Sequence, residues 1–185
     1  SSELQYKDQL DTNDFSLEQD LIVVDRILEN QLKDFLNSFS HVYFVDAGEP
    51  LKNIEHFSNH VKNILETWGS QISRDHRIIS IGGGSVGDFS GFVASVLKRG
   101  VQLTHVPTTW LSAVDSAHGG KTALNVGGVK NQVGSFYPAD TVFLVKEILM
   151  SQPEERAKEA LGEVIKMALI DPDPFLPVLK EKAQS

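Results

Sequence analysis

The sequence predicts an α/β fold in which a doubly wound, mostly parallel sheet is flanked by helices. From residue 20 onward, short β-branched runs alternate with longer segments of helical period, and this alternation is typical of stacked βα units. A glycine-rich turn joins one β-branched run to a helical segment. The 185 residues, 41% of them hydrophobic and 23% charged, suffice for one cofactor-sized domain.

The strands are predicted from short apolar runs bounded by turn residues. They are residues 21–25, 41–46, 77–81, 101–106 and 141–145. Residues 1–19 are polar and acidic, so we expect a loose strand or tail and neither a secretory signal nor a membrane anchor.

Residues 51–68 are predicted to form an amphipathic helix. Apolar side chains recur there at spacings of three and four, from Ile54 to Trp68. His56 and His60 are four residues apart on this helix and could be metal ligands, but no third ligand lies near them in the sequence. We interpret both as solvated surface residues.

The turn after residues 77–81 fits the pattern G-x-G-x-x-G, with Gly82, Gly84 and Gly87. Glycines there let backbone N–H groups approach a pyrophosphate, and a helix start adds partial positive charge. The alternative is a strand-to-helix turn with no ligand. An ordinary Rossmann dehydrogenase is disfavoured, because Lys98 and Arg99 stand where an acidic residue would hold a ribose hydroxyl.

The helix after this turn is predicted to run to about residue 98 and to carry a face of very small side chains. These residues are Gly87, Ser90, Gly91 and Ala94. Something approaches this face closely, either a neighbouring helix or strand or a bound ligand.

Residues 107–131 are too rich in glycine and polar groups to be core, and we predict an irregular, functional connection. Its chemical groups are Asp115, Lys121, Asn125, Lys130 and Asn131. Such a set suits an anionic, polyhydroxylated ligand; the alternative is a solvated polar loop. A P-loop is rejected, because Asp115 stands where that motif requires glycine.

A last helix is predicted from Ser151, whose spacing to Glu154 matches a capping box, to Ile170. Glu163 and Lys166 lie three residues apart on it. By spacing alone they form an ordinary surface pair.

Composition excludes several classes of function. The net charge of −8 offers no positive field for nucleic acid or anionic lipid, so neither partner is expected. The chain has no cysteine, which excludes disulfides and thiolate catalysis and suits a cytoplasmic protein.

Taken in order, a series of motifs from about residue 48 to 176 resembles 3-dehydroquinate synthase and the wider sugar-phosphate cyclases. The motifs are 48–52 (GEPLK), 82–88 (GGGSVGD), 98–100 (KRG), 106–109 (VPTT), 114–116 (VDS), 119–122 (GGKT), 130–131 (KN) and 163–166 (EVIK). Many motifs in one order are far more specific than any single one. The first 47 residues match only loosely.

The resemblance implies a Rossmann-like NAD-binding domain, residues 1–150, followed by the start of a helical domain, residues 151–185, in a homodimeric lyase of the shikimate pathway. The implied substrate is 3-deoxy-arabino-heptulosonate 7-phosphate. A ring hydroxyl is oxidised transiently by NAD, phosphate is eliminated, the ketone is reduced again, and ring opening with aldol closure gives 3-dehydroquinate.

The resemblance also implies which residues hold the cofactor. Glu49 and Lys52 would contact the adenosine side of NAD, and Asp25 its ribose. The pyrophosphate would lie against Gly83, Gly84 and Asp88, the nicotinamide end against Thr108 and Thr109, and Lys130 would assist the cofactor.

The resemblance implies that Asp115, Lys121 and Asn131 would contact the substrate and the nicotinamide, with Lys166 as a further substrate-binding lysine. Arg99 would reach the substrate phosphate across the dimer. Glu163 would be one of three ligands of Zn²⁺ or Co²⁺; the cation would acidify the hydroxyl being oxidised.

Two departures from the family pattern shape the expected function. The family's two zinc-binding histidines would lie beyond Ser185, so we expect an amino-terminal portion that binds NAD without turnover. Trp110, His118 and Val129 also differ from the usual residues, which leaves another substrate, such as sedoheptulose 7-phosphate, open. A metal-dependent alcohol or glycerol dehydrogenase and a non-catalytic nucleotide-binding module are the remaining alternatives.

Overall fold

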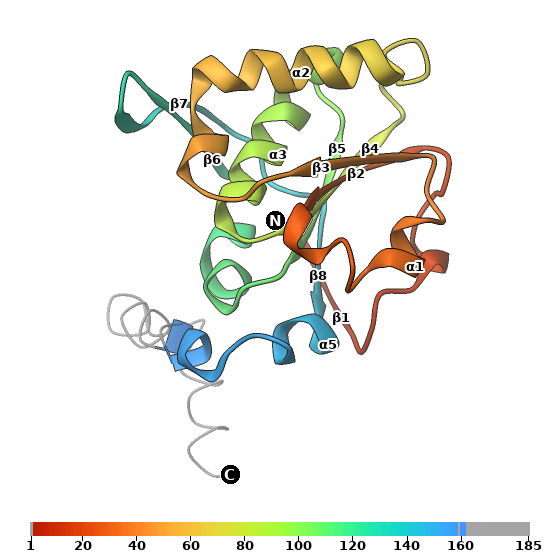
Figure 1. The fold of residues 1–185 in the computed structure, drawn as a ribbon, viewed down its shortest axis with the longest axis vertical. Coiled ribbons are helices and arrows are strands. Elements are labelled where there is room, and N and C mark those ends of the chain that lie inside the picture. Colours follow the sequence, from red (N-terminus) through yellow and green to blue (C-terminus); the bar gives the residue numbers. More distant parts are fainter. Residues whose placement is uncertain (1, 159, 162–185) are drawn as a thin grey trace.

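The predicted α/β fold is confirmed by a computed structural model, which describes residues 2–158, 160 and 161 (Figure 1). Six parallel strands form one sheet in the order β1-β8-β5-β4-β2-β3. Their bounds are β1 Glu3–Lys7, β2 Asp20–Asp25, β3 His41–Val45, β4 Arg77–Gly82, β5 Gln102–Pro107 and β8 Thr141–Val145. The predicted strands therefore begin and end within one residue of the observed ones.

Helices cover both faces of this sheet, as expected for a doubly wound fold (Figure 1). Successive residues of β2 point to opposite faces, so Leu21 and Val23 pack with α2 (Ile54–Trp68) and α3 (Gly84–Val96). Ile22 and Val24 pack on the other side, with α1 (Lys33–Leu36) and α5 (Lys146–Met150).

Helix α2 is shorter than the predicted segment 51–68 because Asn53 caps it. The Asn53 side chain accepts a hydrogen bond from the backbone N–H of Glu55 at 3.1 Å, and the preceding residues form the 3₁₀ turn η3 (Glu49–Lys52). The interpretation of His60 as a solvated surface residue is wrong. Its Nδ1 lies 2.8 Å from the Tyr43 hydroxyl, and burial lowers the pKa of the His60 imidazole.

The predicted irregular connection 107–131 is contradicted. It contains a π-turn, η5 (Ser112–Ser116), a short helix, α4 (Ala117–Gly119), and an antiparallel hairpin of β6 (Lys121–Val126) and β7 (Val129–Phe136). The hairpin was missed because β7 is almost wholly exposed and has little apolar alternation. Gly127 and Gly128, both with positive φ, form the two-residue turn that could have revealed it.

The small-residue face of α3 is explained by strands rather than by a ligand. A Cβ on Gly91 would lie 2.5 Å from Thr122 Cγ2 on β6, and one on Gly87 would lie 3.6 Å from His105 Cε1 on β5. Glycine at 91 therefore lets the hairpin pack directly on α3.

The predicted capping role of Ser151 is also wrong. Its hydroxyl donates to the Ile148 carbonyl oxygen at 2.6 Å, at the end of α5, and the next helical residues begin at Glu154. The remainder of the predicted helix, with Glu163 and Lys166, lies outside the described residues.

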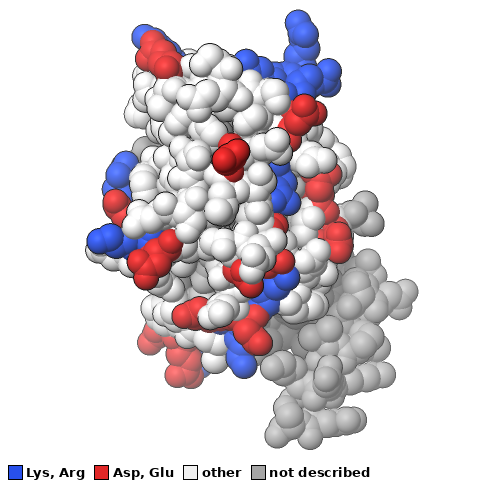
Figure 2. All heavy atoms as spheres, turned by 90° about the vertical axis from the view of Figure 1, so that its right-hand side faces the viewer, with Lys and Arg blue, Asp and Glu red and all other residues white. Residues whose placement is uncertain are grey.

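Surface charge is mixed in sign on the face that Figure 2 shows, where Lys and Arg side chains are interspersed with Asp and Glu. Among the described residues, every helix is too short or too polar to cross a membrane.

Candidate functional site

The strand order places a switch point between β2 and β4. The chain leaves β2 toward β3 at one edge, whereas it leaves β4 toward β5 in the opposite direction. In open α/β sheets, ligands bind in the crevice that such diverging connections leave at the carboxyl ends of the strands. Val24 pairs with Ile81, so the next residues along, Asp25 and Gly82, lie side by side at this edge.

Asp25 supplies an acidic group next to the glycine-rich turn. The chain has no acidic residue about 20 positions after the turn, where Lys98 and Arg99 stand. Asp25 instead comes from the neighbouring strand, which precedes the turn in the chain. Asp25 Oδ1 accepts a hydrogen bond from the backbone N–H of Ile27 at 3.2 Å, which begins the 3₁₀ turn η2 (Arg26–Leu28). Its carboxylate is therefore held in a defined position.

The glycine turn brings backbone close to its neighbours and leaves the start of α3 open. A Cβ on Gly82 would lie 2.5 Å from Val86 Cβ, and one on Gly83 would lie 3.1 Å from Thr109 Cγ2. Gly83 is the N-cap of α3, and within the described residues no side chain caps this helix. The first N–H groups of α3 are thus available to an anion.

Thr108 and Thr109 line a cavity of about 510 Å³ that Asp25 also lines. The Thr108 N–H donates to the Gly82 carbonyl oxygen at 3.0 Å, which fixes the β5 end to the glycine turn. Thr109 Oγ1 accepts from the Ser112 N–H at 3.2 Å, at the start of η5. The cavity is therefore bounded by the ends of β2 and β5.

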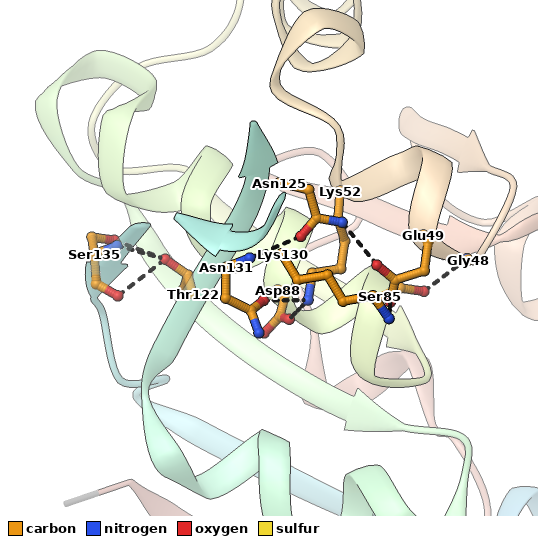
Figure 3. Close-up of polar contacts among 10 residues, drawn as sticks. All are labelled: Gly48, Glu49, Lys52, Ser85, Asp88, Thr122, Asn125, Lys130, Asn131 and Ser135. Atoms are coloured by element: carbon orange, nitrogen blue, oxygen red, sulfur yellow. Dashed lines mark hydrogen bonds and ion pairs between the residues drawn. The ribbon is translucent and has the colours of Figure 1, made fainter. Parts of the chain in front are cut away.

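Lys52 joins three elements at one ammonium group. Its Nζ lies 2.8 Å from Asp88 Oδ2 on α3 and donates to Asn131 Oδ1 on β7 at 3.0 Å (Figure 3). Residue 52 itself belongs to η3 and is buried. The helix that follows the glycine turn and the connection of residues 107–131, which we call the chemical loop, thus both contact Lys52.

Glu49 is held from the hairpin side. Its Oε2 accepts a hydrogen bond from Asn125 Nδ2 at 2.8 Å, and its Oε1 lies 3.7 Å from Lys130 Nζ (Figure 3). The hydrogen bond from Asn125, with the positive charges of Lys130 and Lys52, lowers the pKa of the Glu49 carboxyl although burial opposes this. We call Glu49, Lys52, Asp88, Asn125, Lys130 and Asn131 the polar network.

The pKa of the Asp88 carboxyl is shifted upward, in the opposite direction to that of Glu49, because the side chain is partly buried. The Lys52 ammonium counteracts that rise, and the negative charges of Glu49 and Asp115 reinforce it. Asp115 is exposed on η5 and is close enough for its charge to act on Asp88.

Lys121 begins β6 and is exposed. A P-loop lysine would open a helix, so the rejection of that motif agrees with the structure. The neighbouring Thr122 is fixed on both sides: its Oγ1 contacts Ser135 on β7 (Figure 3), and its methyl group faces Gly91. Lys121 thus extends from a strand that is firmly packed.

Residues 42–159 match the family model described as 3-dehydroquinate synthase N-terminal. The chain belongs to this family. It is 37% identical over 180 residues to 3-dehydroquinate synthase of Pelagibacter ubique, covering 95% of this chain and 48% of that protein. It is 39% identical over 165 residues to the synthase of Shouchella clausii, covering 87% of this chain and 45% of that protein. The chain therefore spans about half the length of these relatives.

Solved structures of sugar-phosphate cyclases share the fold. A crystal structure of 2-deoxy-scyllo-inosose synthase superposes with a TM-score of 0.75 at 25% identity, over 88% of this chain and 49% of that one. A crystal structure described as that of a probable glycerol dehydrogenase from Sinorhizobium meliloti superposes with a TM-score of 0.59 at 17% identity, over 84% of this chain and 42% of that one. The second likeness concerns the fold alone.

Not every residue that the 3-dehydroquinate synthase resemblance assigned comes together here. Arg99 is exposed beyond the carboxyl end of α3, about 20 Å along that helix from the glycine turn, so its contact with the site stays a prediction. Glu163 and Lys166 lie outside the described residues. The sequence predicts no specific contact for Asn125, because its periodicity does not reveal the strand irregularity at this position.

The family resemblance implies a bound Zn²⁺ or Co²⁺. Within residues 2–158, 160 and 161, no group of three or more His, Cys, Asp or Glu side chains is placed to hold a cation. The described part of the chain therefore does not fit a complete zinc or cobalt site.

Proposed function

We propose that this chain is the NAD-binding part of a 3-dehydroquinate synthase, which converts 3-deoxy-arabino-heptulosonate 7-phosphate to 3-dehydroquinate and phosphate. The observation that carries the proposal is the position of Lys52, which joins Asp88 of the glycine-turn helix to Asn131 of the chemical loop. A cofactor and a sugar acid bound on the two sides of this lysine would be in contact. The curated relatives at 37–39% identity bear this name.

The residues around the switch point fit NAD. The uncapped start of α3 suits the pyrophosphate, with Gly83, Gly84 and Asp88 beside it. Asp25 suits a ribose hydroxyl and Thr108 and Thr109 suit the nicotinamide end, because all three line the same cavity. Glu49 and Lys52 suit the adenosine side, because Lys52 contacts Asp88 on α3. When bound, NAD supplies reversible hydride acceptance. A 2-deoxy-scyllo-inosose synthase has been solved with NAD⁺, Co²⁺ and a sugar phosphate analogue.

The chemical loop would orient the phosphorylated acid. Lys121 and Lys130 are exposed cations that attract phosphate and carboxylate groups. Asp115 is an exposed acceptor for a substrate hydroxyl or its proton, and Asn131, held by Lys52, presents an amide to another hydroxyl.

Turnover would need groups that the described residues do not provide. In the proposed enzyme, Glu163 and two histidines from the part of the relatives that this chain does not match would hold Zn²⁺ or Co²⁺, and Lys166 would bind substrate. The active form would be a cytoplasmic homodimer in which the partner's Arg99 reaches the substrate phosphate. We expect the isolated chain to bind NAD and to be inactive.

Calorimetric titration of the chain with NAD tests the cofactor assignment. Heat of binding and a raised melting temperature at millimolar NAD are expected. The absence of both effects would overturn the assignment. The reaction is tested by fusing the chain to the unmatched half of the Pelagibacter ubique synthase and measuring NAD-dependent phosphate release from 3-deoxy-arabino-heptulosonate 7-phosphate.

A paralogous cyclase is the second candidate, because the likeness to 2-deoxy-scyllo-inosose synthase is at 25% identity. The same fusion should be offered sedoheptulose 7-phosphate and glucose 6-phosphate. Faster phosphate release from either one than from the heptulosonate phosphate would favour this candidate.

A further inference from the structure

Asn125 lies at an irregularity of the β6–β7 hairpin. The strand register shifts between Leu124 and Val126, so Asn125 has no partner in the ladder with β7. It instead forms an isolated parallel bridge with Asn53, the N-cap of α2. Such bulges turn a side chain away from the direction that regular alternation would give it.

The redirected side chain makes one hydrogen bond through each end of its amide. Asn125 Nδ2 donates to Glu49 Oε2 at 2.8 Å, and Asn125 Oδ1 accepts from the backbone N–H of Asn131 at 3.0 Å (Figure 3). The carboxylate only accepts and the backbone N–H only donates, so the orientation of the amide is settled by its partners. Asn125 itself is buried, 9% exposed.

Both partners of Asn125 carry a role in the proposed function, Glu49 on the cofactor side and Asn131 on the substrate side. Asn131 has a φ of +54°, a left-handed conformation that asparagine adopts more readily than most non-glycine residues. The Asn125 amide holds the backbone of Asn131, and the Lys52 ammonium holds its side chain.

We propose that Asn125 is a positioning residue that ties the Glu49 carboxylate to the backbone of Asn131, so that the cofactor and substrate sides of the site form as one unit. This inference rests on the proposed function. An aspartate could not replace Asn125, because its second carboxylate oxygen would face Glu49 Oε2 at hydrogen-bond distance with no proton between them. An alanine would leave both partners without their hydrogen bond.

The test uses three variants of the 185-residue chain. Asn125→Ala removes both hydrogen bonds, Asn125→Asp keeps the acceptor for the Asn131 N–H but loses the donor to Glu49, and Asn63→Ala truncates an exposed asparagine on α2 as a control. The measurements are ¹³C NMR titration of the Glu49 carboxyl, hydrogen exchange of the Asn131 amide, and the Kd for NAD by calorimetry.

In Asn125→Ala, we expect the Glu49 carboxyl to titrate at higher pH, because the hydrogen bond that lowers its pKa is lost. We also expect the Asn131 amide to exchange about tenfold faster and the Kd for NAD to rise about tenfold. In Asn125→Asp, the Glu49 titration and the Kd should rise while the Asn131 amide keeps its protection. Asn63→Ala should match the wild-type chain. If Asn125→Ala does not fold, the test rests on Asn125→Asp, in which the Glu49 titration and the Kd should change while the protection of the Asn131 amide does not.

Two results separate the failure of the inference from that of the function. A wild-type chain that leaves NAD unbound overturns the proposed function. A wild-type chain that binds NAD, with variants at residue 125 that leave its Kd and the Glu49 titration unchanged, overturns the positioning role alone.

Discussion

Lys52 and Asp88 form an ion pair that is largely shielded from water. Their charged atoms lie 2.8 Å apart, and their side chains are 11% and 20% exposed. The pair Lys62–Glu66 on α2 is 3.6 Å apart with side chains 68% and 63% exposed. Because water screens the second pair far more than the first, the two offer a direct comparison within one chain.

Lys52→Met should lower the free energy of unfolding by about 1–3 kcal/mol, because it leaves the Asp88 carboxylate partly buried without its cation. Lys62→Met should change it by less than about 0.5 kcal/mol. Urea denaturation of both variants checks this. Equal losses of unfolding free energy in the two variants would show that the Lys52–Asp88 pair stabilises the chain no more than the exposed Lys62–Glu66 pair.

Gly91→Ala should destabilise the chain by about 1–3 kcal/mol, because the new methyl group would meet Thr122 Cγ2 at 2.5 Å. The double variant Gly91→Ala/Thr122→Ser lacks the opposing methyl group and should regain most of the lost stability, as judged by thermal denaturation.

Gly119→Ala is the matched control for this substitution. A Cβ there meets nothing within 4 Å, so its melting temperature should equal that of the wild type. A double variant no more stable than Gly91→Ala would indicate that contact with the hairpin is not the cause of the loss.

The stability of the chain should fall between pH 7 and 5 because of His105. Burial, with a smaller contribution from His118, lowers the pKa of the His105 imidazole from 6.5 to about 4. In this window the unfolded chain binds more protons at His105 than the folded chain does, so protonation favours unfolding as the pH drops.

His105→Gln should remove about 2 kcal/mol of that loss between pH 7 and 5. Denaturation curves at several pH values check this, with the exposed His56→Gln as control. A pH dependence unaltered by His105→Gln would contradict the prediction.

Lys121→Ala should lower kcat/KM of the fused enzyme more than about tenfold, because it removes an anion contact on the proposed substrate side. Its melting temperature should not change, since the side chain is exposed. The exposed Lys33→Ala on α1 should leave both quantities unaltered, and wild-type kinetics in Lys121→Ala would refute the role.

The sequence predicted the parallel sheet well, because each buried strand is a short apolar run with a sharp end. The run 141–145 coincides with β8, and 77–81 lacks only the final Gly82 of β4. These strands are buried on both faces, so hydrophobicity alone marks them.

The site was predicted only in part, for two physical reasons. Asp25 and Gly82 lie far apart in the sequence, and only the order of the strands brings them together. The exposed β7 gave no apolar alternation, so the hairpin and the redirected side chain of Asn125 could not be found from periodicity. The Gly127–Gly128 pair was the one local signal for it.

The pairing of β1 with β8 joins the beginning of the chain to a segment more than 130 residues later, with Glu3 opposite Thr141. During synthesis on the ribosome, the residues of β1 cannot pair until β8 has emerged. Contacts of such large sequence separation also form slowly. The amino-terminal strand is therefore the segment of this sheet most exposed to chaperones and to mispairing before folding is complete.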